Sequence, residues 1–66
     1  MPVNPKKIRK LREALGLSQT DAAKRAKFSL QRWNNIESGR RLALDPDALF
    51  AVAKALECDM EELLKK

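Results

Sequence analysis

The chain has 66 residues, one cysteine and no histidine, and it carries a net charge of +5 at pH 7. This length suits a single small domain, whose stability is marginal unless its helices pack closely or a partner adds buried area. With Cys58 alone and no histidine, the chain can form neither an internal disulfide nor a cysteine/histidine zinc site. No run approaches the roughly 20 apolar residues of a membrane span, and no signal peptide is evident. We therefore expect a cytoplasmic protein with no metal, cofactor or small-molecule ligand.

The charge is unevenly distributed along the sequence. Residues 1–18 hold five positive side chains and one negative, and residues 19–41 hold six positive and two negative, so each part has a net charge of +4. Residues 42–66 hold three positive and six negative side chains, a net charge of −3. A basic front and an acidic tail suit a polyanion on one side and water or another subunit on the other. Small proteins are also often basic for solubility, so charge alone leaves that alternative open.

The first predicted helix lies between Pro5 and Gly16. Apolar residues recur at helical spacing in this segment, at Ile8, Leu11 and Leu15. Gly16 follows at the place of a C-terminal cap.

The next two predicted helices are separated by barely three residues. Ser18 and Asp21 form a weak capping box that opens a segment ending near Lys27. Ser29 caps the following segment, and Gly39 closes it. Ala22, Ala23 and Ala26 form the inner face of the first segment, and Leu30, Trp33 and Ile36 share a face in the second. Small residues would let the two helices cross closely, so we predict a helix-turn-helix over about residues 18–38.

Two further helices are predicted in the C-terminal third. Asp45 followed by Pro46 is typical of an N-cap and a first helical residue. The buried stripe of this helix is expected at Leu49, Val52, Ala53 and Leu56. Asp59 and Glu62 repeat the capping pattern before a last apolar set, Met60, Leu63 and Leu64. No alternating strand pattern or linker competes with an all-α fold of five helices in one domain, residues 1–66.

The helix-turn-helix segment reads LSQTDAAKRAKFSLQRWNNIESGRR. This run resembles the helix-turn-helix of the lambda-type phage repressors and their bacterial relatives, the XRE type. The likeness extends to the first helix and to DPDALFAVAKALECDMEELL, so it covers almost the whole chain. Ala23 takes the small-residue position, while Trp33 and Ile36 take the inward apolar positions of the recognition helix. The resemblance implies a compact five-helix, lambda-repressor-like DNA-binding domain.

The sequence departs from this family at two positions that usually hold glycine. Lys27 occupies the turn, and Glu57 follows the fourth helix. Each residue is expected to accept a left-handed backbone at modest cost. The surface that would face DNA is not affected by either departure.

Four side chains of the third helix are predicted to read base edges. With its apolar positions turned inward and about 100° between residues, Gln31 and Asn35 point away from the core. Arg32 flanks this face, and Leu30 lies at the helix start, the end that enters the major groove in this motif. Gln31 or Asn35 suits adenine, Arg32 suits guanine, and Leu30 suits a thymine methyl. The alternative is that these are solvated residues on a surface helix.

A second group is predicted to bind backbone phosphates and so fix register without conveying sequence. Exposed N–H groups and the helix dipole favour an anion at the start of the second helix, where Gln19 lies. The resemblance implies that Gln19 also braces the reading residues. The other candidates are Ser29, Asn34, Arg40, Arg41 and Lys10. For any single lysine, a solvated surface role is an equal alternative.

Glu37 lies about 40° from the inward direction of the third helix and needs a partner there. The resemblance implies that this partner is Arg12 on the first helix. Pairing avoids the several kcal/mol typically lost when one buried charge is left alone. We expect the pair to be structural.

The resemblance also implies a homodimer on an inverted-repeat operator, with half-sites about one helical turn apart. The sequence holds more large apolar side chains than one small core requires. The extra ones are the candidates for the interface, namely Leu42, Leu44, Phe50 and Met60. The alternative is that they complete the core of the monomer. Cys58 takes the place of a small apolar residue, which favours a buried thiol over a reactive one.

The sequence therefore predicts a sequence-specific regulator that binds double-stranded DNA, most simply a transcriptional repressor of bacterial or phage origin associated with the nucleoid. The alternative is a DNA-binding antitoxin or a protein-interaction module of a larger regulatory complex. An enzyme is disfavoured, because Cys58 and the carboxylates have no activating partner and the sequence has no glycine-rich phosphate loop. A steep loss of affinity with salt would distinguish a DNA-binding protein from a protein-binding module.

Overall fold

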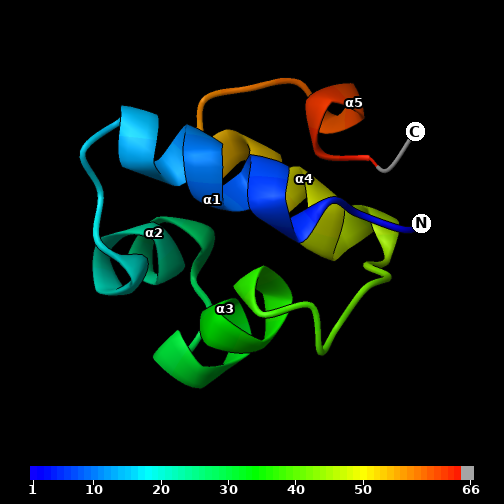
Figure 1. The fold of residues 1–66 in the computed structure, drawn as a ribbon, viewed down its shortest axis with the longest axis horizontal. Helices are drawn as coiled ribbons and strands as arrows, with labels where there is room; N and C mark the ends of the chain where they lie inside the picture. Colours follow the sequence, from blue (N-terminus) through cyan, green and yellow to red (C-terminus); the bar gives the residue numbers. More distant parts are fainter. Residues whose placement is uncertain (65–66) are drawn as a thin grey trace.

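The structure, a computed structural model, describes residues 1–64 and contains five α-helices in that range (Figure 1). They are α1 (Pro5–Ala14), α2 (Gln19–Ala26), α3 (Leu30–Glu37), α4 (Pro46–Ala55) and α5 (Met60–Leu63). Helices α1 and α4 lie in the middle, with α5 on one side and α2 and α3 on the other (Figure 1). The predicted all-α fold class is confirmed. Within residues 1–64, every helix is too short or too polar to cross a membrane.

Side chains that bind free backbone N–H groups determine where the helices begin. Before α2, Ser18 Oγ accepts from the Asp21 N–H at 3.1 Å, and the Asp21 carboxylate accepts from the Ser18 N–H at 3.4 Å. This is the predicted capping box. The cap of α1 was not predicted: Asn4 Oδ1 accepts from the N–H groups of Lys6 and Lys7 at 3.1 and 3.3 Å. The other predicted N-caps in the structure are Ser29, Asp45 and Asp59, and the Asp59 N–H donates to Glu62 Oε2 at 3.2 Å.

The two positions where the family usually has glycine adopt the expected left-handed backbone. Lys27 has φ 60° and Glu57 has φ 56°. This conformation costs an L-residue about 1–2 kcal/mol. At the second site, Arg25 Nη1 lies 2.9 Å from Glu57 Oε2 and donates to the Ala55 carbonyl at 3.3 Å. These contacts connect α2 to the end of α4.

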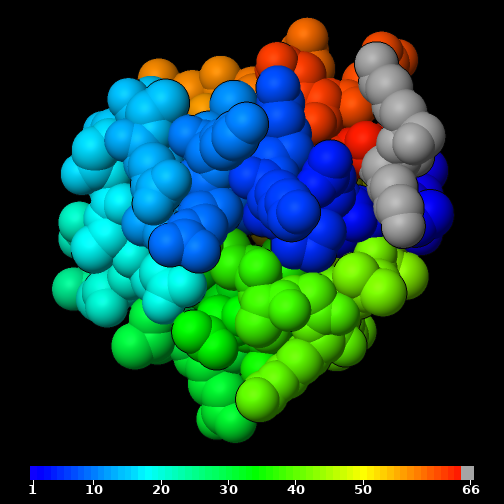
Figure 2. All heavy atoms as spheres, in the orientation of Figure 1, coloured from blue at the N-terminus to red at the C-terminus, as the bar shows by residue number. Residues whose placement is uncertain are grey.

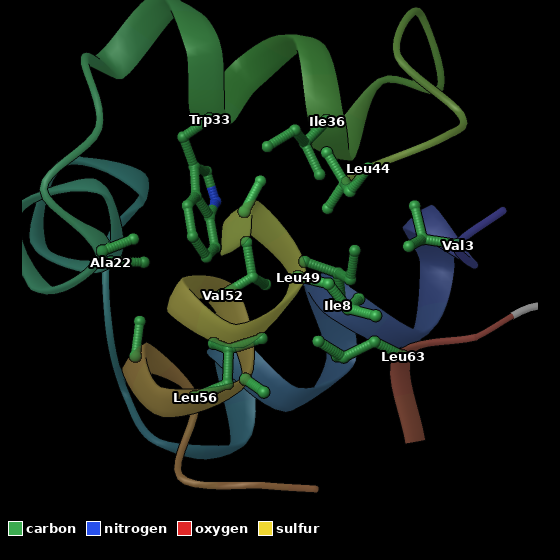
Figure 3. Packing of buried hydrophobic residues seen from close by; sticks show 14 of the residues in the cluster. Val3, Ile8, Ala22, Trp33, Ile36, Leu44, Leu49, Val52, Leu56 and Leu63 are labelled. Atoms are coloured by element: carbon green, nitrogen blue, oxygen red, sulfur yellow. The ribbon is translucent and has the colours of Figure 1, made fainter. Parts of the chain in front are cut away.

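The core is formed by large apolar side chains, among which Trp33 projects from α3 toward Val52 of α4 (Figure 3). The largest fully buried side chains are Val3, Ile8, Trp33, Ile36, Leu44, Leu49, Val52 and Leu63. Buried alanines line the inner face of α2, namely Ala22, Ala23 and Ala26. Because these side chains are small, α2 packs closely against both α3 and α4. The buried stripe predicted for α4 is confirmed.

Leu44 was predicted as an interface residue, and that prediction is wrong because the side chain is buried in the core beside Ile36 (Figure 3). The N-terminal segment covers this part of the chain. The Leu44 N–H donates to the Met1 carbonyl at 3.0 Å, and the Val3 N–H donates to the Leu42 carbonyl at 2.8 Å. Leu44 therefore completes the monomer, which is the alternative that the sequence left open.

Three other apolar residues depart from the predicted helical faces. Leu15 is exposed, because α1 ends at Ala14 and Leu15 is its C-cap. Leu30 is also exposed and does not join Trp33 in the core. Leu64 lies just outside α5 and forms an isolated β-bridge with Val3.

Candidate nucleic-acid interface

Helix α3 presents one face to the core and the other to solvent. Trp33 and Ile36 are buried, whereas Gln31 and Asn34 are exposed. Leu30, at the start of the helix, is 49% exposed. The helix projects along one edge of the molecule, at the opposite end from α5 (Figures 1 and 2). Its outer face is therefore free to contact a flat or grooved partner.

Two of the predicted base-reading residues are partly covered. The Arg32 guanidinium lies over the Phe28 ring, 4.0 Å from the ring centroid. Asn35, which was expected to point directly away from the core, is half-buried. Its carbonyl accepts from the Arg41 N–H at 3.1 Å, so the loop after α3 folds back over this residue. Leu30, Gln31 and Asn34 are the more open side chains.

A buried carboxylate connects α3 to α1 and α2. The Glu37 side chain is 4% exposed and that of Arg12 is 11% exposed. Arg12 donates to both carboxylate oxygens, from Nε at 2.7 Å and from Nη2 at 3.1 Å. The Trp33 indole N–H also donates to this carboxylate, and Gln19 Nε2 donates to it at 3.3 Å. The remaining Arg12 nitrogen, Nη1, donates to the Leu17 carbonyl at 2.7 Å. Both charges are therefore paired and hydrogen-bonded, which is the condition under which burial is tolerated.

Gln19 connects this carboxylate to the exposed face of α3. Its Nε2 donates to Glu37, and its Oε1 accepts from Asn34 Nδ2 at 3.3 Å. Because a carboxylate only accepts, the amide nitrogen of Gln19 must face Glu37 and its oxygen must face Asn34. Asn34 must then direct one N–H toward Gln19. Its Oδ1 and its second N–H remain for another partner.

The other phosphate candidates lie at the start of α3, in the loop after it and on α1. Ser29 is the N-cap of α3, where its Oγ accepts from the Arg32 N–H at 3.1 Å. Arg40 and Arg41 are exposed in the loop that follows α3, and Lys10 is exposed on α1. Arg40 and Arg41 therefore place positive charge in the loop that follows α3.

Arg9 also borders this face, and the sequence reasoning missed it. A hollow of about 210 Å³ is lined by Arg9, Gln19, Asn34, Glu37 and Ser38. A signal was present in the sequence, because Arg9 precedes Arg12 by three residues and so shares its side of a helix. Once Arg12 was expected to face α3, Arg9 was the neighbouring cation.

Cys58 lies half-buried near the junction of α4 and α5, far along the chain from these residues. Burial raises the pKa of its thiol, and the carboxylates of Glu62 and Asp59 raise it further, while Lys7 acts in the opposite direction. A raised pKa keeps the thiol protonated at neutral pH, so it is a poor nucleophile. Within residues 1–64, acidic and cysteine side chains form no cluster suited to a metal ion.

The sequence matches the family model of a helix-turn-helix domain over residues 6–65. No curated protein matches it significantly. The family match is consistent with the resemblance to XRE-type repressors. It supports DNA binding, because helix-turn-helix domains bind DNA. Members of this family are typically not enzymes. The chain belongs to the helix-turn-helix domain family.

Proposed function

We propose that the chain, acting as one domain, binds specific sequences of double-stranded DNA and represses transcription, with α3 in the major groove. The observation that carries this proposal is the exposed face of α3, supported from beneath by the buried Arg12–Glu37 pair. Gln31 offers an amide that suits adenine, and Leu30 offers an apolar surface for a thymine methyl. A rigid helix that presents such groups is the usual means of direct readout.

Arg32 and Asn35 complete the proposed base-reading set. Arg32 must leave the Phe28 ring to reach a guanine. A cation–π contact at an exposed site contributes about 0.5–1 kcal/mol. A bidentate arginine–guanine pair gives about 1–3 kcal/mol of discrimination. The exchange is therefore favourable where the operator places a guanine within reach.

Phosphate contacts in this proposal surround the recognition helix. The contributing residues are Gln19, Ser29, Asn34, Arg40, Arg41 and Lys10. Gln19 and Asn34 each keep one amide N–H that is not used in the chain of hydrogen bonds to Glu37. A phosphate accepts from such groups, and the first turn of α2 adds the favourable end of a helix dipole.

We further propose that two copies bind an inverted-repeat operator. Three interface candidates remain: Leu42 is 53% exposed, Phe50 is 56% exposed, and Met60 is half-buried. Leu42 lies in the loop that follows α3, so twofold pairing there would place one copy of α3 near each side of the contact. Phe50 and Met60 line a separate hollow between α4 and α5. Serine substitution at Leu42 or Phe50, followed by analytical ultracentrifugation, distinguishes the two surfaces.

The test of the function is selection from a random duplex library at near-physiological salt, followed by ultracentrifugation of the complex with the enriched duplex. An inverted repeat bound by two chains is the expected result. Failure to enrich any sequence, together with weak binding to all DNA, would contradict the proposal.

A DNA-binding antitoxin or a protein-interaction module of a larger regulatory complex is the second candidate. One observation favours it: the exposed Phe50 borders a hollow of about 650 Å³ with Met60, Cys58 and Glu61. Exposed apolar surface beside a hollow is typical of protein contacts. Both predict tight binding of a protein, and a module that binds protein alone also predicts little response to nucleic acid.

A further inference from the structure

We propose that Arg9 binds a DNA phosphate at the α1 edge of the interface and that it leaves Glu13 to do so. The inference rests on the proposed function and adds to it a phosphate site that the sequence did not predict. The ligand class is a phosphodiester of the DNA backbone.

The first argument is position. Arg9 lines the same small hollow as Gln19 and Asn34, the two side chains whose amides face the outer surface of α3. The backbone of a DNA strand that meets Gln19 at the start of α2 therefore passes within reach of a long side chain at Arg9. Lys10, the predicted α1 contact, does not line this hollow.

The second argument is the charge at the base of the hollow. Glu37 contributes to the lining, and a free carboxylate would repel a phosphate. Its side chain is 4% exposed, however, and Arg12 neutralises it through two hydrogen bonds. The Ser38 hydroxyl donates to the Asn35 carbonyl at 3.2 Å. Arg9 is therefore the positively charged side chain that lines this hollow, and it is not paired with a buried group.

The third argument is that Arg9 is held weakly. Its Nε lies 3.4 Å from Glu13 Oε2, and the two side chains are 65% and 55% exposed. Such exposed pairs contribute little and are screened by salt. Within residues 1–64, Arg9 donates a hydrogen bond to Glu13 through Nε alone. The two Nη groups of its planar guanidinium therefore remain for bidentate contact with a phosphate.

The test uses the full chain and a duplex carrying the selected sequence, with a scrambled duplex beside it. Dissociation constants are measured between 50 and 200 mM salt for the parent and for Arg9→Gln. Each phosphate contact contributes about 0.9 to the slope of log affinity against log salt. For each bound chain, the parent should therefore lose roughly 3.5-fold more affinity over this range than Arg9→Gln. The loss should be the same on both duplexes, because phosphate contacts carry no sequence information.

Three controls sharpen the result. Arg9→Lys keeps the charge and should keep most of the slope. Glu13→Gln frees Arg9 and should tighten binding to both duplexes. Lys54→Gln removes one positive charge from α4, where Lys54 lies 5.8 Å from the Phe50 ring centroid, and should leave the slope unchanged.

A slope for Arg9→Gln equal to that of the parent, or a change no larger than that of Lys54→Gln, would overturn the inference and leave the proposed function intact. A parent chain that binds neither duplex would overturn both. Circular dichroism of each variant checks that it is folded.

Discussion

The two faces of α3 differ in what they contact and in how tightly they are held. On the inner face, Trp33 and Ile36 are buried and Glu37 is fully hydrogen-bonded. On the outer face, Leu30 and Gln31 are exposed and have few constraints. One short helix thus joins a side that stabilises the fold to a side that is free to bind. Substitutions on the two faces should therefore separate stability from DNA binding.

The largest effect is expected from Trp33→Ala on the inner face. Truncation of a buried aromatic side chain costs about 3–5 kcal/mol. A domain of this size has a free energy of unfolding of roughly 3–10 kcal/mol in total. We expect a variant that is largely unfolded or melts far below the parent in circular dichroism. A melting temperature within a few degrees of the parent would contradict the assignment of Trp33 to the core.

Glu37→Ala should be nearly as destabilising, because it leaves the Arg12 charge buried without its partner. Removal of one member of a buried pair costs about 3–5 kcal/mol. The matched control is Glu13→Ala, which breaks the exposed pair with Arg9 and should change the free energy of unfolding by less than about 0.5 kcal/mol. Urea denaturation followed by circular dichroism measures both. Equal midpoints for the two variants would show that Glu37 is not structural.

On the outer face, Gln31→Ala should leave stability unchanged and weaken specific binding. Loss of one good base contact costs about 1–3 kcal/mol. The free energy of binding to the selected duplex should become less favourable by that amount, so its dissociation constant should rise. The dissociation constant for scrambled DNA should stay the same. A melting temperature clearly below the parent would mean that the two faces of α3 are not separable.

The smallest effect is expected from Arg40→Gln at the edge of the outer face. Loss of one phosphate contact should lower the salt slope by about 0.9 for each bound chain, on any duplex. An exposed substitution of this kind changes stability by no more than about 0.5 kcal/mol. Titration of the selected and scrambled duplexes at several salt concentrations measures the slope. A loss confined to the selected duplex would instead make Arg40 a base-reading residue.

Most of the fold could be predicted because its signals are local. The caps at Ser18, Ser29 and Asp45 and the apolar spacing of each segment lie within a few residues of the helices they define. Leu44 could not be placed in the same way. Its burial depends on a pairing with Met1, more than forty residues away along the chain. Sequence spacing carries no information about such a contact.

The candidate site was predictable to the extent that helical geometry determines it. The angle between residues placed Gln31 outward and Glu37 inward. It could not show that Arg32 would rest on the Phe28 ring, because that depends on the rotamer of a long side chain. The link from Glu37 through Gln19 to Asn34 also required coordinates, since it joins three side chains from two helices.

The central claim is that the outer face of α3 recognises sequence. The most direct measurement is the ratio of the dissociation constants for the scrambled and the selected duplex at near-physiological salt. We predict that the selected duplex binds at least about 10³-fold more tightly, as is typical of specific operators. Equal affinity for the two duplexes would contradict the claim.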